Sequence, residues 1–138
     1  MSQMSQVIYT DGSCMPNPGL GGYGFVVLPT KSDPLEWHVS GGEYSITTNN
    51  RMELTAVIEA IKFCYDKDNL TIYSDSMYVI NCAKGKWKKS KNIDLWEKYD
   101  YESRGKVIEW IWVKGHSKDY YNEIVDSLAK KEVKNKIK

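Results

Sequence analysis

The chain has 138 residues, 41% of them hydrophobic and 27% charged, with a formal net charge of +1 at pH 7. This length suits one domain with a real core, and the composition is that of an ordinary globular protein rather than a disordered or fibrous one. The net charge neither requires nor excludes a nucleic-acid partner, and no apolar run approaches the roughly 20 residues that a membrane span needs.

The first part of the chain predicts three short strands joined as an antiparallel meander. Residues 7–10 favour a strand and stop at Asp11-Gly12-Ser13, a sequence typical of a turn. A loop rich in proline and glycine follows over residues 16–22, and a second strand is expected at about residues 23–28. The third strand is predicted at residues 37–43.

The middle of the chain predicts helices around a fourth strand. Asn49 and Asn50 can cap a helix, in which apolar residues recur at helical spacing up to residue 61. A strand over residues 70–74 ends at Asp75. A short helix at residues 77–82, a lysine-rich stretch at residues 84–91 and a helix at residues 93–101 follow.

The last two predicted elements complete an α/β fold. Residues 107–113 carry apolar side chains on both faces, which predicts a strand buried inside the sheet. The final helix begins near Tyr121, and its core side is formed by Ile124, Val125, Leu128 and Ala129. The order β-β-β-α-β-α-α-β-α predicts a mixed sheet with helices packed against it, in a single domain spanning residues 1–138.

Four acidic residues occupy positions where a solvated surface charge is not expected: Asp11, Glu53, Asp75 and Asp126. Asp11 and Asp75 follow predicted strands, and ligands gather at the carboxyl ends of strands in such sheets. Glu53 and Asp126 lie on or beside the apolar side of their helices, where a carboxylate is costly unless it is paired or binds a cation. Taken singly, each residue also fits a turn, a helix cap or support of a helix dipole. Those roles explain poorly why four acids should converge on one sheet edge.

Converging carboxylates suit a hard divalent cation. Mg²⁺ takes oxygen ligands and keeps several waters, so it can also accept phosphate oxygens. Two such ions about 4 Å apart can clamp the attacking and leaving oxygens of a phosphodiester. The sequence has only two histidines, His38 and His116, and shows no cysteine–histidine cluster that would bind zinc instead.

Four motifs, in order along the chain, resemble those of ribonuclease H type 1. The first is Tyr-Thr-Asp-Gly-Ser-Cys at residues 9–14, followed by Asn-Pro-Gly at 17–19 and Gly-Gly-Tyr-Gly at 21–24. The second is Thr-Thr-Asn-Asn-Arg-Met-Glu-Leu at 47–54, and the third is Ser-Asp-Ser at 74–76 with Tyr-Val at 78–79. The fourth comprises Trp-Val-Lys-Gly-His at 112–116, Asn-Glu at 122–123 and Asp-Ser-Leu-Ala at 126–129. The match covers residues 7–131, and four ordered motifs are far more specific than one.

The resemblance implies a ribonuclease H-like fold, in which a five-stranded mixed sheet of three antiparallel and then parallel strands has helices on both faces. It implies an endoribonuclease that hydrolyses the RNA strand of RNA–DNA hybrids by two-metal-ion catalysis and leaves 3′-hydroxyl and 5′-phosphate products. The metal ligands for two Mg²⁺ ions, with Mn²⁺ able to substitute, would be Asp11, Glu53, Asp75 and Asp126. His116 would shuttle protons or help the product to leave, although a plain surface-loop histidine is the alternative. Glu123 would lie near the attacking water or be a solvated helix charge.

The resemblance also implies where the hybrid is bound. The expected minor-groove contacts are the backbone of Gly12, Ser13 and Cys14 and the side-chain amides of Asn17, Asn49 and Asn50. Thr48 and Asn92 match positions that hold a DNA-strand phosphate, and Met77 stands where a glutamine often touches a base edge. From the residues alone, Asn49 can instead cap its helix, and Asn17 can form a turn between prolines.

The basic segment at residues 83–91 is shorter than the protrusion of the family's bacterial members, but it keeps five lysines and a tryptophan. Basic residues interleaved with an aromatic ring suit phosphate contacts and packing on sugars and bases. We therefore expect contact with the hybrid from Lys86, Trp87, Lys88 and Lys89. The alternative is a solvated lysine loop with the tryptophan covering the core. Residues 130–138 contain further lysines, which we expect to complement the helix dipole.

Other interpretations remain open at this point. Integrases, transposases and junction resolvases share this architecture and act on DNA, and a non-catalytic hybrid-binding domain or a domain cut from a reverse transcriptase would also fit the pattern. The asparagine motifs and His116 favour a ribonuclease H over the DNA-acting enzymes, and the presence of all four carboxylates favours an enzyme. Three cysteines without a C-x-x-C pair, and an N-terminus unlike a targeting peptide, indicate a reducing, cytoplasmic location. We expect a free-standing monomer that binds no membrane.

Overall fold

Five strands and four helices make up the residues that the computed structural model describes, which are 5–114 and 119–137. The strands are β1 (Gln6–Met15), β2 (Gly19–Val27), β3 (Trp37–Thr47), β4 (Asn69–Ser74) and β5 (Val107–Trp112). The helices are α1 (Asn49–Phe63), α2 (Met77–Ala83), α3 (Ile93–Ser103) and α4 (Tyr120–Ile137). The elements follow the order that the sequence predicts.

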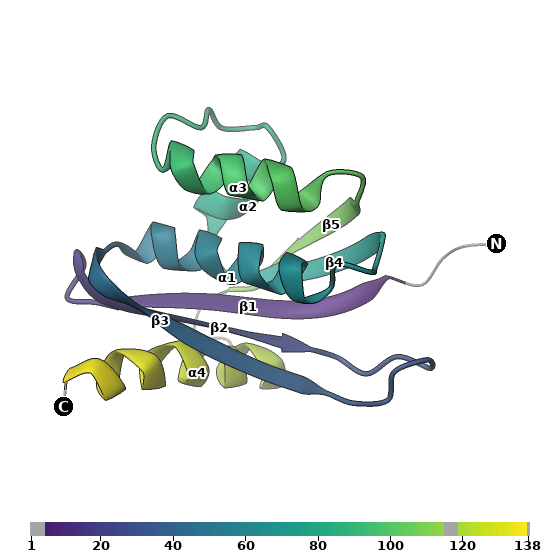
Figure 1. Ribbon diagram of the computed structural model, residues 1–138, viewed down its shortest axis with the longest axis horizontal. Helices are drawn as coiled ribbons and strands as arrows, with labels where there is room; N and C mark the ends of the chain where they lie inside the picture. The colour runs from purple at the N-terminus through teal and green to yellow at the C-terminus, as the bar shows by residue number, and fades with distance from the viewer. Residues whose placement is uncertain (1–4, 115–118, 138) are drawn as a thin grey trace.

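The strands form one mixed sheet in the order β3-β2-β1-β4-β5. β1, β2 and β3 are antiparallel to their neighbours, whereas β4 runs parallel to β1 and β5 runs parallel to β4. Figure 1 shows α1 and α3 stacked on one side of the sheet and α4 alone on the other side. The predicted meander, the mixed sheet and the helices on both faces are thus confirmed.

Each face of the sheet has its own apolar core. Successive residues of a strand point to opposite faces, and β1 shows this directly. Ile8 packs in the larger core beneath α1, α2 and α3, while the next residue, Tyr9, packs in the smaller core beneath α4. Trp96 of α3 is buried in the larger core, and Val125 of α4 is buried in the smaller one. The two cores hold α1 and α4 against opposite faces of the same strand.

The turn predicted at Asp11-Gly12-Ser13 is wrong, because β1 continues through these residues to Met15. The antiparallel pairing with β2 explains the difference: Asp11 is opposite Gly24, and the register runs on to the last residue of β1. The chain reverses at residues 16–18 instead. On the other side of β1, the pairing with β4 reaches only Tyr9. Asp11 therefore lies just beyond the point where these two parallel strands stop pairing.

Two further predictions are corrected by the structure. β5 is the edge strand of the sheet rather than a buried strand, so Val107 is 68% exposed and Trp112 is 51% exposed. The second correction concerns the cap of helix α1. Thr48 caps this helix, because its hydroxyl oxygen accepts a hydrogen bond from the backbone N–H of Arg51 at 3.2 Å, and neither asparagine does so.

The predicted core side of α4 is confirmed. Val125 and Ala129 are buried, and Ile124 and Leu128 are half-buried against the same core.

The described helices and cysteines have two further features. None of the helices in residues 5–114 and 119–137 combines the length and apolar character that crossing a membrane requires. Cys14, Cys64 and Cys82 are all buried free thiols. Burial raises the pKa of each thiol, and that of Cys64 reaches about 11. The three side chains therefore act as small apolar groups that pack in the interior.

Helix α1 approaches β1 most closely at Gly12. A Cβ atom at this position would lie 2.3 Å from the backbone nitrogen of Glu53 and 2.4 Å from the carbonyl carbon of Met52. Real side chains do not tolerate such distances from backbone atoms, so only glycine allows the helix to sit this close to the strand. Gly12 thereby determines how deeply the N-terminal half of α1 sits on the sheet.

We predict that Gly12→Ala destabilises the protein by about 1–3 kcal/mol or more, because the added methyl group must push α1 away from β1. Urea unfolding followed by circular dichroism measures the change. Ser13→Ala is the matched control: the neighbouring residue already carries a Cβ atom, and its substitution should change stability little. A Gly12→Ala protein as stable as the parent would contradict the close approach.

Candidate active site

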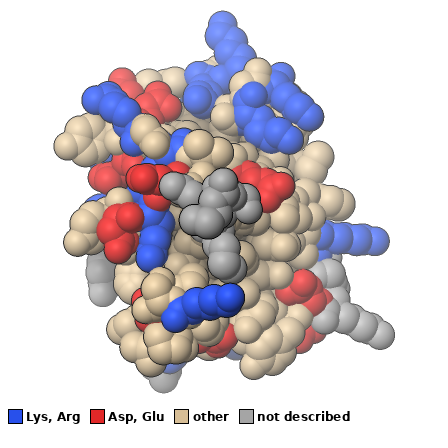
Figure 2. Space-filling view, turned by 90° about the vertical axis from the view of Figure 1, so that its right-hand side faces the viewer, with Lys and Arg blue, Asp and Glu red and all other residues tan. Residues whose placement is uncertain are grey.

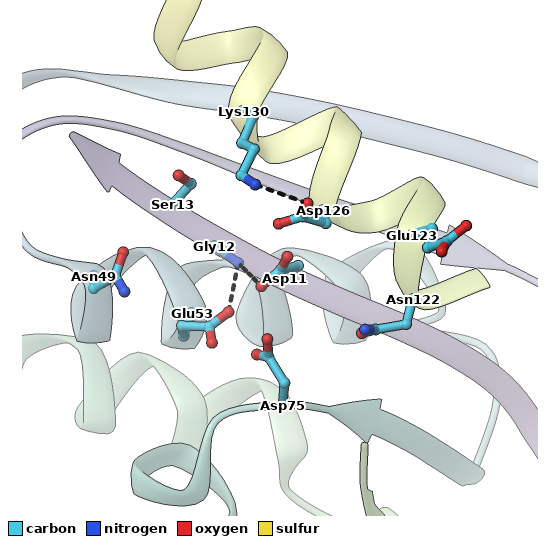
Figure 3. A pocket seen from close by; sticks show the side chains of 10 residues that line it. All are labelled: Asp11, Gly12, Ser13, Asn49, Glu53, Asp75, Asn122, Glu123, Asp126 and Lys130. Atoms are coloured by element: carbon cyan, nitrogen blue, oxygen red, sulfur yellow. Dashed lines mark hydrogen bonds and ion pairs between the residues drawn. The ribbon is translucent and has the colours of Figure 1, made fainter. Parts of the chain in front are cut away.

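A hollow of about 420 Å³ opens beside the end of β4, between α1 and α4 (Figure 3). Its walls come from β1, the first half of α1, the residue after β4, and α4. The lining residues are Asp11, Gly12, Ser13, Asn49, Glu53, Asp75, Asn122, Glu123, Asp126 and Lys130. All four carboxylates singled out in the sequence are in this set.

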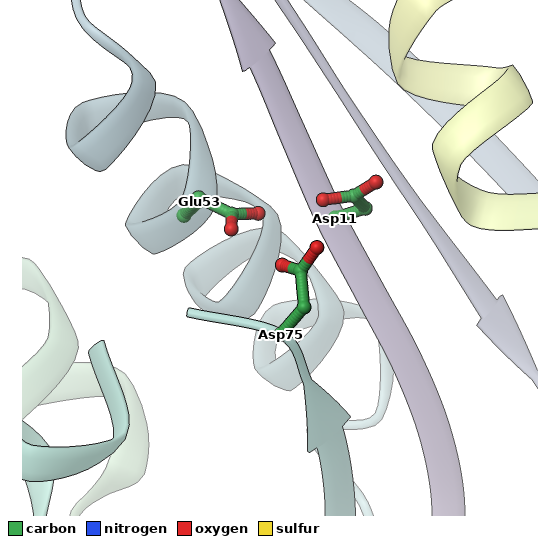
Figure 4. A group of neighbouring side chains, drawn as sticks. All are labelled: Asp11, Glu53 and Asp75. Atoms are coloured by element: carbon green, nitrogen blue, oxygen red, sulfur yellow. The ribbon is translucent and has the colours of Figure 1, made fainter. Parts of the chain in front are cut away.

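Three of these carboxylates form a tight group. Asp11, Glu53 and Asp75 each offer an oxygen atom, and these atoms lie within 4.8 Å of one another. Figure 4 shows the three side chains pointing toward one another from β1, α1 and the end of β4. β1 and β4 are parallel neighbours, so Asp11 and Asp75 come together where their pairing ends. Glu53 reaches them because α1 lies so close to Gly12.

Backbone groups hold the cluster in place. The N–H of Gly12 donates to Oε1 of Glu53 and, at 2.9 Å, to Oδ1 of Asp11. The indole N–H of Trp112 donates to the backbone carbonyl of Asp75 at 3.3 Å. Oδ1 of Asp75 is buried and finds no hydrogen-bond partner among the described residues. A buried acceptor without a partner is costly, so this oxygen suits a bound cation.

The cluster carries an unfavourable concentration of negative charge. Burial and the nearby carboxylate of Asp75 raise the pKa of Asp11 from its ordinary value of 3.8 to about 7. Burial and the charge of Asp11 likewise raise the pKa of Glu53 well above its usual range. Without a cation, the group therefore retains a proton near neutral pH. A divalent cation would offset the repulsion between these carboxylates.

The fourth carboxylate, Asp126, lies in the same hollow but apart from this group. Its Oδ2 atom is 3.0 Å from Nζ of Lys130, one turn further along α4 (Figure 3). We expected Lys130 to complement the helix dipole, but it lines the hollow and pairs with Asp126 instead. Two opposite charges four residues apart on a helix are a sequence signal that predicts such an ion pair.

Two further residues of α4 line the hollow. Glu123 is exposed at its rim. Asn122, for which the sequence predicts no role, is buried in its wall.

Only some of the residues predicted to contact the minor groove line the hollow. Ser13 and Asn49 line the hollow. Asn17 lies beside them, because its Oδ1 accepts the backbone N–H of Asn49 at 3.1 Å and joins the β1–β2 turn to the start of α1. Asn50 is exposed on α1 and does not line the hollow. The side chain of Cys14 is buried, and its Sγ atom lies within hydrogen-bonding distance of two backbone carbonyls, so only its backbone is available for contact.

Thr48 and Asn92 come together around Arg51, a residue of the motif at residues 47–54 for which the sequence suggests no role. The backbone N–H of Arg51 donates to Thr48, and its guanidinium Nη1 donates to Oδ1 of Asn92 at 3.3 Å. Asn92 precedes α3 in a left-handed conformation with φ at 58°. No sequence pattern predicts this meeting, because Arg51 and Asn92 are 41 residues apart.

The lysine-rich segment lies at the top of the molecule in Figure 1, and Figure 2 shows basic side chains gathered at that end. Lys86 and Lys88 are exposed, and Trp87 is 49% exposed rather than covering the core. Lys89 differs from them. Its Nζ atom lies 4.9 Å from the ring centroid of Trp96 and 3.8 Å from a carboxylate oxygen of Asp100. Lys89 is therefore packed against α3, whereas Lys86 and Lys88 extend into solvent.

The two remaining predicted site residues are Met77 and His116. Met77 begins α2 and is 48% exposed, but it is not among the lining side chains. His116 lies outside the described residues, so its expected place beside the carboxylates stays a prediction.

Comparison with known proteins agrees with this geometry. A family model described as RNase H matches residues 3–134. Ribonuclease HI of Haemophilus ducreyi is 48% identical to this chain, with 89% of this chain and 86% of that protein covered. Ribonuclease H of Wolbachia pipientis wMel is 42% identical, with 96% and 98% covered.

Solved structures show the same fold. LC11-RNase H1, crystallised in complex with an RNA/DNA hybrid, superposes with a TM-score of 0.82 at 22% identity and covers 97% of this chain and 100% of its own. RNase H1 from the halophilic archaeon Halobacterium salinarum superposes with a TM-score of 0.77 at 23% identity, with 96% and 99% covered. The family model spans nearly the whole chain, and the two relatives exceed 40% identity over most of their length. The chain therefore belongs to the ribonuclease H family.

Proposed function

We propose that this protein hydrolyses the RNA strand of RNA–DNA hybrids and leaves 3′-hydroxyl and 5′-phosphate ends. The observation that carries the proposal is the group of Asp11, Glu53 and Asp75 within 4.8 Å, with Asp126 in the same hollow. The proposal is supported by relatives that are named ribonuclease H and by a related structure that holds an RNA/DNA hybrid. An end-labelled hybrid incubated with and without Mg²⁺ tests it directly, with double-stranded DNA as the comparison substrate.

The four carboxylates would hold two Mg²⁺ ions, with Mn²⁺ able to substitute. The donors are all hard oxygen atoms, and the buried Oδ1 of Asp75 has no other partner among the described residues. When bound, such ions stabilise charge on the phosphate and lower the pKa of an attacking water. Asp126 would join them, and Oδ2 of its carboxylate lies 3.0 Å from Nζ of Lys130.

The chain's own groups prepare the site for this chemistry. Gly12 orients two carboxylates through one N–H, and Trp112 fixes the backbone of Asp75, so these oxygens need little rearrangement. We assign to His116 the transfer of a proton during cleavage or product release, as the family resemblance implies. This assistance would be distinct from metal binding.

Recognition of the hybrid is assigned to two groups of residues, one for each strand. A 2′-hydroxyl both donates and accepts hydrogen bonds and distinguishes RNA from DNA. Ser13 and Asn49 line the hollow, and Asn17 is hydrogen-bonded to Asn49, so we assign to these three residues the contact with the RNA strand. Their hydroxyl and amide groups include both donors and acceptors. Thr48 and Asn92 would hold a phosphate of the DNA strand. Lys86 and Lys88 would extend this phosphate contact.

We predict that Asp11→Asn, Glu53→Gln and Asp75→Asn each lower turnover by at least about 10²–10³-fold while the fold is retained, because each removes a charge that binds the cation. Cleavage of the labelled hybrid in Mg²⁺ measures the loss. Asp66→Asn makes the same chemical change on the exposed surface and should leave turnover unchanged. Near-normal turnover in any of the three site variants would refute the assignment.

The raised pKa of Asp11 predicts a pH-dependent stability. Because the folded protein holds this proton up to about pH 7, ionisation of Asp11 opposes folding, and the penalty grows as the pH rises from 3.8 through about 7. In EDTA, Asp11→Asn should be close to the parent in stability at pH 4 and more stable by on the order of 2–4 kcal/mol at pH 8. Urea unfolding at both pH values measures the difference. If the difference in unfolding free energy between Asp11→Asn and the parent were the same at both pH values, ionisation of Asp11 would not destabilise the fold.

The lysine-rich segment predicts different results for different lysines. Replacing Lys86 and Lys88 together with alanine should weaken hybrid binding and flatten the slope of log affinity against log salt by about two units, because each lysine on a phosphate contributes about 0.9. Lys89→Ala should instead lower the melting temperature, since Lys89 packs over Trp96. Binding titrations at several salt concentrations separate the two effects. An equal loss of slope in Lys89→Ala would contradict this division.

A further inference from the structure

The side-chain amide of Asn92 is fixed from both ends. Its Oδ1 accepts from Nη1 of Arg51 at 3.3 Å, and its Nδ2 donates to the hydroxyl of Tyr78 at 3.0 Å. Asn92 precedes α3, but its side chain forms no hydrogen bond that caps the helix. The second N–H of Nδ2 has no acceptor among the described residues, so one donor of a rigidly held amide is left for a ligand.

The chemistry of the neighbours determines which way this amide faces. A guanidinium group can only donate, so the oxygen of Asn92 must face Arg51. An indole N–H can also only donate, and that of Trp96 points at the hydroxyl oxygen of Tyr78 from 3.0 Å. The Tyr78 hydroxyl directs its own hydrogen toward the carbonyl of Lys91, at 3.5 Å, so its oxygen is an acceptor for both Trp96 and Asn92. The opposite orientation of the Asn92 amide is excluded, because its Nδ2 group would then face the guanidinium of Arg51 and both groups are donors.

Arg51 is itself held by a two-pronged ion pair. Its Nη1 and Nη2 atoms donate to the two carboxylate oxygens of Asp94 at 3.0 and 2.7 Å. The hydrogen bonds from Arg51 lower the pKa of Asp94 to about 2. The backbone N–H of Arg51 also donates to Thr48, so one residue links both groups that are assigned to the DNA-strand phosphate. Bidentate pairing restricts the guanidinium more than a single ionic contact on the surface does.

We infer that Arg51, Asp94 and Tyr78 are positioning residues that aim the remaining N–H of Asn92 at a phosphate of the DNA strand. They determine hybrid affinity through Asn92 and contact no carboxylate of the cleavage site. The inference rests on the proposed function, because the phosphate belongs to the hybrid. It adds to that function by naming the side chains, on α1, α2 and α3, that make the phosphate contact rigid before the substrate arrives.

The charge of Asp94 provides a test in which two explanations predict opposite signs. If Asp94 affected binding only through its negative charge, Asp94→Asn would tighten binding of the anionic hybrid. If Asp94 positions Arg51 and thereby Asn92, the substitution should weaken binding and raise KM about tenfold, the typical value of one hydrogen bond to a charged group, with kcat unchanged. Glu97→Gln, which removes the same charge from the exposed side of the same helix, is the matched control and should not weaken binding.

The dependence on Asn92 separates positioning from a general structural effect. Tyr78→Phe should also raise KM without lowering kcat, and neither it nor Asp94→Asn should have a further effect once Asn92 is replaced by alanine. Fluorescence anisotropy with a labelled hybrid in EDTA gives the affinities, and thermal unfolding confirms that each variant is folded. Additive losses in the double variants, or a response to Asp94→Asn that matches the Glu97→Gln control, would overturn the inference. Failure of the parent enzyme to cut the hybrid would instead overturn the proposed function.

Discussion

The contact between Gly12 and the start of α1 is the constraint on which the site depends. The absence of a side chain lets the helix backbone approach the strand to a distance that no other residue allows. The same residue then uses its N–H to hold the carboxylates of Asp11 and Glu53. One position thus provides both the steric gap and the hydrogen-bond donor. A displacement of α1 away from β1 would move Glu53 away from Asp11 and Asp75.

The rest of the fold compensates for a site that is unfavourable by itself. Three carboxylates held together repel one another, and burial deprives them of water, as the raised pKa values of Asp11 and Glu53 record. The two apolar cores on opposite faces of the sheet supply the stability that keeps these groups in place. Such a site is arranged for binding cations before they arrive, at the expense of the stability of the empty protein.

The sequence predicts most of the elements and the convergence of the carboxylates, because both depend on local patterns. Apolar periodicity locates α1, and the alternation of strands and helices predicts which ends share an edge of the sheet. The failures concern pairing between distant segments. The length of β1 depends on its pairing with β2. The exposure of β5 depends on its position at the edge of the sheet, and the position of the Lys89 side chain depends on Trp96. A residue's own neighbours in sequence carry no information on these partners.

The position of β5 at the edge of the sheet has a consequence for self-association. An unpaired strand edge exposes backbone N–H and C=O groups to which another chain can add a strand. Here the edge is six residues long, and a charged side chain, Glu109, is exposed in its middle. Lys106 and Lys114 lie at its two ends. A second copy that aligned its own β5 edge to edge would bring like charges together, so this short, charged border disfavours pairing of β5 with the β5 strand of another copy.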